Sequence, residues 1–331
     1  MYDITLPDVW QEGLSWGQRK KAAQDMALVM GWAGYRQREE RMAHCGDYLY
    51  FARYEDEKRE LIRAELCRDR LCPNCAYLRS RKVFGQVCRV MNAMPDKLAY
   101  LFLTLTVKNC RAEDFDKTLD NMFHGWQNLI RRNAFKPVKG WFRALEVTYN
   151  AARNDYHPHF HVILAVPPSY FSHGYVSHAR WVQLWKDCAG LDYAPSVDVR
   201  RVKPDQAGSL IGAVKEVAKY TVDLSKMLKS EDLSELVTPI ETLAIGLKGR
   251  RLVGFGGLMK KLHKELDLTD PVDGELVEPE LRPDVAYVVE RYRWGIGADW
   301  TWYKLDEQTR EQYEAARRLT PPSKVEGDDS S

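Results

Sequence analysis

Apolar residues recur at helical spacing in two stretches of the chain. Residues 17–43 carry Met26, Val29 and Met30 among lysine, arginine and glutamate side chains, and residues 112–132 carry a similar apolar stripe. Apolar positions three or four residues apart lie on one face of a helix. The pattern therefore predicts a helix in each stretch.

Shorter apolar runs, rich in β-branched and aromatic residues, predict strands. These runs occupy residues 98–107, 141–149, 157–166 and 196–202. Helical patterns follow at about residues 177–188 and 205–229. The order strand, helix, strand, strand, helix, strand, helix predicts an α+β fold. We expect a ferredoxin-like or RRM-like antiparallel sheet with helices on one face.

The pattern changes after about residue 262. Residues 265–290 hold nine acidic side chains and one basic side chain, a net charge of −8, and three prolines interrupt any long helix there. Residues 285–294 and 299–305 predict a late hairpin, and a polar tail ends the chain. The sequence thus divides into an N-terminal helical segment (1–40), a cysteine-rich module (41–95), a central domain (96–262) and an acidic connector with the tail (263–331).

Composition places the chain among globular proteins. It has 331 residues, 45% hydrophobic and 29% charged, which excludes collagen, a coiled-coil rod and a disordered tail protein. Its formal net charge is only +2. The acidic stretch carries −8, so the rest of the chain carries +10. The near-neutral total is therefore no argument against nucleic-acid binding.

The N-terminal sequence and the cysteine count indicate a cellular compartment. The first residues contain no apolar core of a secretory signal, and the apolar run at 98–107 is too short to span a bilayer. The seven cysteines form an odd number. Reduced thiols, a cytoplasmic location and no membrane role are expected.

Cysteines cluster between residues 45 and 75. The cluster consists of Cys45, Cys67, Cys72 and Cys75, with arginine and lysine side chains around it. Four thiolates form the closed tetrahedral site typical of structural Zn²⁺, and the basic surroundings suit a module that faces phosphate. His44 is an alternative to Cys45 as a ligand. A Cys-x-x-Cys redox pair or buried free cysteines are the other interpretations.

Three histidines lie close together in the run His157-Pro158-His159-Phe160-His161. Alternate residues of a strand share a face, so His159 and His161 are expected to point the same way. Two imidazoles in this arrangement can bind one divalent ion. The competing interpretation is a pair of ordinary polar residues on an exposed face.

The preceding strand offers a carboxylate to the same face. If the hairpin turns symmetrically between Arg153 and Asn154, Glu146 lies opposite His161. Opposed residues share a face, with Cβ atoms about 5 Å apart. Two histidines and one carboxylate would bind a metal and leave open positions for water or substrate oxygens.

The last predicted helix carries Glu216 and Tyr220, which are four residues apart and therefore neighbours on its surface. Lys215 and Lys219 flank them. Taken alone, this helix favours an ordinary interpretation, with Tyr220 an aromatic at the edge of the core and Glu216 a surface acid.

Together these segments resemble the plasmid rolling-circle replication initiators of the HUH endonuclease superfamily, in the group with one nucleophilic tyrosine and an accompanying glutamate. The resemblance runs from about residue 40 to residue 265. The matching pieces are Cys45-Gly46 with CRDRLCPNC, FLTLT (102–106), LEVTYN, HPHFHV, EVAKY (216–220) and RRLVGFGGLMKKL (250–262).

The resemblance implies that residues 96–262 form an HUH nicking domain. His159, His161 and Glu146 would then hold a catalytic Mg²⁺ or Mn²⁺. Tyr220 would be the nucleophile that forms a 5′-phosphotyrosine, and Glu216 the acid that handles the closing cleavage.

Further expectations concern the surroundings of this site and the partners. His157 and Lys219 are expected to support the ligands or to contact DNA. The expected partners are plasmid origin DNA, as a hairpin or a single-stranded nick site, and the host helicase and polymerase. Two alternatives stay open: a zinc-dependent DNA-binding regulator without nicking activity, and an HUH transposase or relaxase. Those relatives often use two tyrosines, whereas no second tyrosine lies within helical reach of Tyr220.

Overall fold

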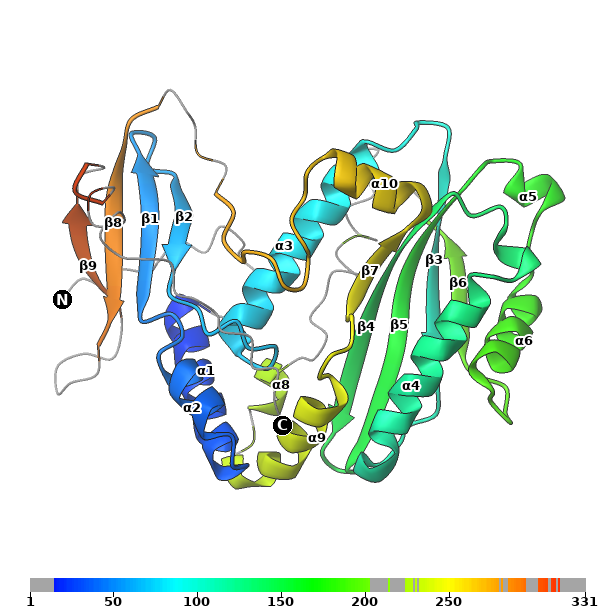
Figure 1. Ribbon diagram of the computed structural model, residues 1–331, viewed down its shortest axis with the longest axis horizontal. Coiled ribbons are helices and arrows are strands. Elements are labelled where there is room, and N and C mark those ends of the chain that lie inside the picture. Colours follow the sequence, from blue (N-terminus) through cyan, green and yellow to red (C-terminus); the bar gives the residue numbers. More distant parts are fainter. Residues whose placement is uncertain are drawn as a thin grey trace. The chain divides into compact units, whose positions relative to one another are not determined.

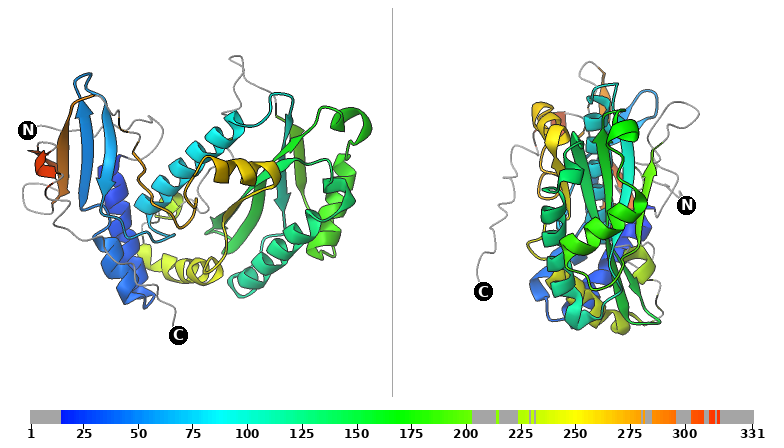
Figure 2. Two further views of the ribbon diagram at one scale, coloured as in Figure 1. Left: turned by 45° about the horizontal axis from the view of Figure 1, so that its top comes forward. Right: turned by 90° about the vertical axis from the view of Figure 1, so that its right-hand side faces the viewer.

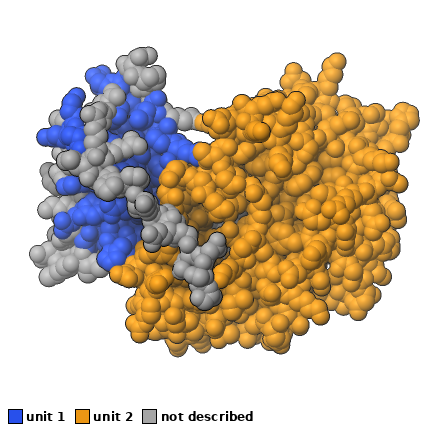
Figure 3. Space-filling model, viewed as in Figure 1, with its two compact units in different colours: residues 1–21, 44–66, 277–331 blue, residues 22–43, 67–276 orange. Residues whose placement is uncertain are grey.

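The structure is a computed structural model, and it divides the chain into two compact units (Figure 3). The first unit comprises residues 1–21, 44–66 and 277–331, and the second comprises residues 22–43 and 67–276. The residues that the structure describes are 15–202, 214, 224–228, 230, 232–279, 281, 285–295, 303–308, 311–313 and 315. The four-part division expected from the sequence stays a prediction.

The second unit is built on an antiparallel sheet (Figure 1). Its strands are β3 (Ala99–Thr106), β4 (Gly140–Asn150), β5 (Asp155–Val166), β6 (Val197–Arg201) and β7 (Val253–Gly256). They lie in the order β6-β3-β5-β4-β7. The predicted α+β class is confirmed, and the first four positions of this order are those of a ferredoxin-like sheet. Strand β7 extends that sheet beyond β4 and was not predicted.

Two long helices cover one face of this sheet. They are α4 (Ala112–Leu129) and α6 (His178–Ala189), and both were predicted. On β5, Phe160, Val162 and Leu164 point to this face and are completely buried. The ring of Phe160 packs edge-on against rings of both helices, so this layer holds β5 firmly.

The opposite face of the sheet also carries a helix, which corrects the expectation of helices on one face only. Helix α3 (Pro73–Asn92) packs against it and, with residues such as Phe102, Phe142 and Ile163, forms one buried cluster. To that cluster α3 contributes Val83, Val87, Val90 and Met91, and Met94 follows just beyond the helix. Their spacing is helical, but the cysteines drew the interpretation of residues 41–95 toward a loop-like module. Figure 2 shows the sheet between these layers.

Shorter elements complete the second unit. They are α2 (Arg36–Ala43), α5 (Tyr170–His173), α8 (Leu224–Met227), α9 (Val237–Gly246), α10 (Gly257–Glu265) and two 3₁₀ turns, Asn133–Phe135 and Leu233–Leu236. The helix predicted over 17–43 is interrupted: α1 (Trp16–Trp32) ends before Gly34, whose φ of +84° breaks the helix, and α2 follows.

The first unit contains a second antiparallel sheet, in the order β2-β1-β8-β9. Its strands are β1 (Tyr48–Tyr54), β2 (Arg59–Ala64), β8 (Tyr287–Trp294) and β9 (Tyr303–Gln308). The predicted late hairpin is thus confirmed as β8 paired with β9. The sequence did not reveal β1 and β2, or that β8 pairs with β1 across more than two hundred residues.

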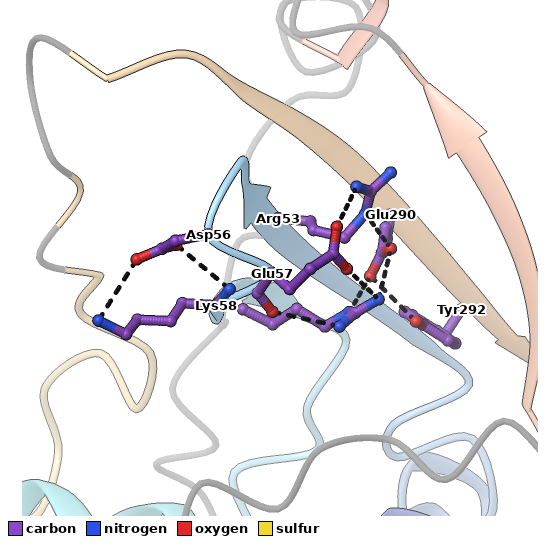
Figure 4. A network of polar contacts seen from close by, with 7 residues as sticks. Arg53, Asp56, Glu57, Lys58, Glu290 and Tyr292 are labelled. Carbon is purple, nitrogen blue, oxygen red and sulfur yellow. Dashed lines mark hydrogen bonds and ion pairs between the residues drawn. The ribbon is translucent and has the colours of Figure 1, made fainter.

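A buried carboxylate ties three strands of this sheet together (Figure 4). Glu290 on β8 is 1% exposed and accepts hydrogen bonds from Arg53 on β1 and Arg59 on β2, both at 2.7 Å. Tyr292 donates a further bond at 3.0 Å. Burial raises the pKa of Glu290, but the hydrogen bonds from Arg59 and Tyr292 outweigh it and lower the pKa below its ordinary value.

None of the helices in the described part of the chain is both long enough and apolar enough to cross a membrane.

We predict that Glu290→Ala lowers the free energy of unfolding by about 2 kcal/mol, because two arginines lose their shared partner while staying partly hydrated. The measurement is chemical denaturation followed by circular dichroism. Glu57→Ala is the matched control: Glu57 pairs with the same arginines but its side chain is 68% exposed, so its loss should change stability by less than about 0.5 kcal/mol.

Folding lowers the pKa of Glu290, so stability should also depend on pH. The contribution of Glu290 to the free energy of unfolding should be complete above the ordinary value of 4.5, and it should be lost as the pH falls from there through the lowered pKa of the folded state. Equal losses in both variants would contradict this account.

Candidate active site

Strand β5 brings histidines to the sheet face opposite α4 and α6. Its pairing with β4 places Glu146 opposite His159, and Ala144 opposite His161. The predicted pairing of Glu146 with His161 is wrong by two residues. The turn spans Ala151–Asn154 instead of centring on Arg153 and Asn154, because the strands continue to the pair Asn150 and Asp155. A shift of two residues preserves the face, so all three side chains still converge.

The three predicted metal ligands form a tight group. The Nε2 atom of His161 lies 3.0 Å from Oε2 of Glu146, and Nε2 of His159 lies 3.5 Å from the same oxygen. The two Nε2 atoms are 3.1 Å apart. Both histidines are buried, with 8% and 7% of their surface exposed, and the Glu146 side chain is 21% exposed. The group is therefore largely buried on this face of the sheet, and solvent reaches it on the side of Glu146.

Charge and burial compete at Glu146. Burial raises the pKa of its carboxyl group, but hydrogen bonds and charge from His159 and His161 outweigh burial and bring the pKa far below its ordinary value. The carboxylate is therefore ionised at any physiological pH. An ionised carboxylate beside two imidazoles is the state in which these groups can bind a cation.

The donor set fits a divalent cation. Two ligands at right angles, each about 2.1 Å from an ion, are about 3 Å apart. The three donor atoms are separated by 3.0–3.5 Å, so small movements would suffice to enclose an ion. Imidazole and carboxylate suit Mn²⁺ and other borderline ions, and the open side leaves coordination positions for substrate.

Neighbouring groups orient the imidazoles. The Nδ1 atom of His161 lies 3.3 Å from the hydroxyl of Thr104 on β3, and Nδ1 of His159 lies 3.3 Å from the carbonyl oxygen of His157. Partners on the second ring nitrogen fix the tautomer and the orientation of a metal-binding histidine. Sequence reasoning missed the role of Thr104, although its alternation within FLTLT already placed it on this face.

His157 lies on the same face and continues the row of histidines. Its ring centroid is 5.3 Å from that of His159, and its Nδ1 atom is 2.8 Å from Oδ1 of Asn109. Burial, and then the nearby His159, lower the pKa of His157. The side chain is thus held beside the three predicted ligands, and its expected role in supporting them or contacting DNA stays a prediction.

Tyr220, Glu216 and Lys219 lie outside the described residues, so their predicted roles stay predictions. Val214, in the same predicted helix, is helical and 2% exposed. It belongs to the buried cluster that includes Ala144 and Ile163, on the face of the sheet that carries the histidines.

The cysteines form a second possible metal site. The sulfur atoms of Cys67, Cys72 and Cys75 lie within 4.8 Å of one another, and those of Cys67 and Cys75 are 3.7 Å apart. Cys72 directly precedes α3, and Cys75 lies in its first turn, so the start of the helix aims both sulfurs at one point. These three thiols of the second unit could hold one metal ion, consistent with a zinc module, and the expected fourth ligand, Cys45, belongs to the first unit.

Comparison with known proteins decides the family. Residues 58–304 match the model of the Rep_1 family, described as replication protein. The chain belongs to this family of replication proteins. The matched region contains the Glu146, His159 and His161 group and three of the four clustered cysteines.

Several curated relatives agree with the family. A Bacillus protein named Protein rep is 35% identical over 281 residues, covering 80% of this chain and 92% of its own length. A Protein rep of Bacillus amyloliquefaciens is 35% identical over 294 residues, covering 81% and 87%. One of Streptococcus pneumoniae is 36% identical over 271 residues, covering 80% and 83%. No solved structure matches the chain.

We predict that the purified protein contains about one Zn²⁺ per chain and that Cys75→Ser loses most of it, because three thiolates hold zinc far less tightly than four. Elemental analysis by mass spectrometry measures the content. Cys88→Ser is the matched control, since Cys88 lies on the same helix but outside the cysteine group. Equal zinc content in the two variants would refute the assignment.

Proposed function

We propose that this protein initiates rolling-circle replication of a plasmid by nicking one strand of origin DNA. The convergence of Glu146, His159 and His161 in a protein of the replication family is the observation that carries the proposal. A regulator that only binds DNA has no need for an ionised carboxylate and two buried imidazoles around one open position.

The proposed chemistry begins at a phosphodiester held at this open position. A bound Mg²⁺ or Mn²⁺ would polarise the phosphate and offset its negative charge. Glu146, His159 and His161 would hold that ion, and Thr104 and the carbonyl of His157 would keep the two imidazoles oriented. The buried layer beneath Phe160 would keep β5 from moving as DNA binds.

Tyr220 is the proposed nucleophile. Its phenolic oxygen would attack phosphorus, the bond from phosphorus to the 3′ oxygen would break, and that oxygen would leave as a 3′-OH after taking up a proton. The products are a 5′-phosphotyrosine and a 3′ end that a polymerase can extend. The helical, buried Val214, six residues earlier and packed on the histidine face of the sheet, supports the placement of this segment near the metal ligands.

Glu216 is proposed to act in the closing step. As a general base it would take a proton from water, and the water oxygen would attack the phosphorus at the regenerated nick site. The bond from that phosphorus to the 3′ oxygen would break, and the 3′ oxygen would take up a proton and be freed as a 3′-OH of the displaced strand. That 3′-OH would then attack the phosphorus bound to Tyr220, which closes the displaced strand into a circle, and the phenolate would leave and regain its proton. One tyrosine would thus suffice for initiation, and no second covalent adduct would remain. Lys219 is proposed to contact DNA in the same region.

The remaining parts of the proposal concern the surroundings. The cysteine group is proposed to bind structural Zn²⁺ through Cys45, Cys67, Cys72 and Cys75, which would stabilise the start of α3. The substrate is proposed to be origin DNA presented as a hairpin or a single strand. Host helicase and polymerase are the proposed partners, and the proposed location is the cytoplasm.

We predict that the protein forms a covalent adduct with a labelled single strand that spans the origin nick site when Mn²⁺ is present, and that Tyr220→Phe abolishes it. Denaturing gel electrophoresis detects the adduct. Tyr175→Phe is the control, because Tyr175 is 62% exposed and lies between α5 and α6, outside the group of predicted ligands, so the adduct should be unchanged. An adduct that persists in Tyr220→Phe would refute the nucleophile, and its absence in the unaltered protein would favour a non-nicking regulator.

We predict that Glu216→Ala still nicks but fails to terminate, because only the closing step needs a base for water. A plasmid replication assay in cell extract should show multimeric single-stranded product in this variant and unit-length circles with the unaltered protein. Unit-length product from Glu216→Ala would show that another group activates the water.

A further inference from the structure

A cavity of about 370 Å³ opens where β3 ends, at the edge of the sheet next to α4 and α6. Three segments line it: residues 107–111 after β3, one side of α4, and the end of α6 with the residues that follow it, namely Ala189, Leu191 and Tyr193. From α4 come Asp114, Lys117, Thr118 and Asn121, which share one face of the helix at three- and four-residue spacing. The cavity is large enough for one nucleotide and is not used by the chemistry described above.

The lining of the cavity combines positive charge with an aromatic ring. The lining contains three cationic side chains, Lys108, Arg111 and Lys117, and one carboxylate, that of Asp114. The guanidinium of Arg111 already donates a hydrogen bond to the carbonyl oxygen of Arg153, in the turn between β4 and β5, at 3.0 Å. Lys108 and Lys117 are exposed and are placed to meet an anion that enters.

Tyr193 is held in a fixed orientation at this cavity. Its hydroxyl accepts a hydrogen bond from the backbone N–H of Lys108 at 2.8 Å, and the Lys108 ammonium lies 4.2 Å from the ring centroid. A held ring next to a cation is the arrangement on which a nucleic-acid base stacks while its phosphate meets the charge. Amide and hydroxyl groups of Asn121 and Thr118 add donors and acceptors for a base edge.

One side chain connects the cavity to the metal ligands. Asn109 lines the cavity, donates through Nδ2 to Asp155 at 2.9 Å, and accepts through Oδ1 from Nδ1 of His157 at 2.8 Å. His157 in turn lies against His159. A strand whose phosphate sits at the metal ligands and that continues past His157 and Asn109, around the end of β3, would bring a nearby nucleotide to the cavity.

We propose that this cavity binds one nucleotide of the substrate strand close to the scissile phosphate, with its base on Tyr193 and its phosphate near Lys108 and Lys117. The proposal rests on the proposed nicking function and deepens it. The site would select single-stranded DNA, because a base enters the cavity only after it leaves its pair.

The test is an abasic scan of a labelled single strand that spans the origin nick site, measured by fluorescence anisotropy with chelator present to prevent cleavage. With the unaltered protein, removing the base at one position near the nick should weaken binding by about tenfold. With Tyr193→Leu that penalty should fall below about twofold, because the ring on which the base stacks is absent. Tyr193→Phe keeps the ring and should restore the penalty, and Tyr175→Leu should leave the scan unchanged.

A second arm tests the charge. Lys117→Gln should weaken binding of every strand and reduce the slope of log affinity against log salt by about 0.7, the value for one phosphate contact on a single strand. Lys136→Gln, an exposed lysine outside the cavity, serves as the control. An abasic scan that is the same in Tyr193→Leu and the unaltered protein would overturn the proposal, as would tight binding of the free mononucleotide dTMP with no position effect in strands.

The adduct assay separates this proposal from the proposed nicking function. A position-specific abasic penalty without an adduct would support the nucleotide site and refute the proposed nicking function. An adduct without any Tyr193-dependent penalty would support the nicking function and refute the nucleotide site.

Discussion

The alternation of side chains along β5 is the constraint on which the site depends. Phe160, Val162 and Leu164 are completely buried beneath α4 and α6, so the residues between them must face the other way. That requirement puts His159 and His161 side by side. A slip of one residue would turn the histidines toward α4 and α6 and remove Phe160, Val162 and Leu164 from that layer, so packing on one face fixes the chemistry of the other.

This constraint explains how much of the site the sequence could predict. The faces of Glu146, His159 and His161 followed from alternation alone, and an error of two residues in the register left them unchanged. The exact turn could not be predicted, because it depends on where the strands cease to pair. The hydrogen bond between Asn109 and His157 joins the loop after β3 to strand β5, so no local sequence pattern predicts it.

The rest of the fold shows which elements a local sequence pattern can predict and which it cannot. The order of the central strands and helices was predictable because each element has a clear apolar period. Helix α3 was missed although its apolar spacing is regular, since the cysteines suggested a module without much regular structure. The sheet of the first unit joins β1 to β8, and the alternation of a strand does not reveal its partner. Its buried Glu290 shows that long-range pairing is reinforced by charge as well as by backbone hydrogen bonds.

The most direct test of the account is to locate the cation. Crystals soaked in MnCl₂ and measured at the manganese absorption edge should give an anomalous peak bounded by Nε2 of His159, Nε2 of His161 and the carboxylate of Glu146. Crystals of Glu146→Gln should show a much weaker peak, because the ionised ligand is gone. Manganese bound elsewhere in the second unit, or an equal peak in Glu146→Gln, would contradict the central claim that these three residues form the catalytic metal site.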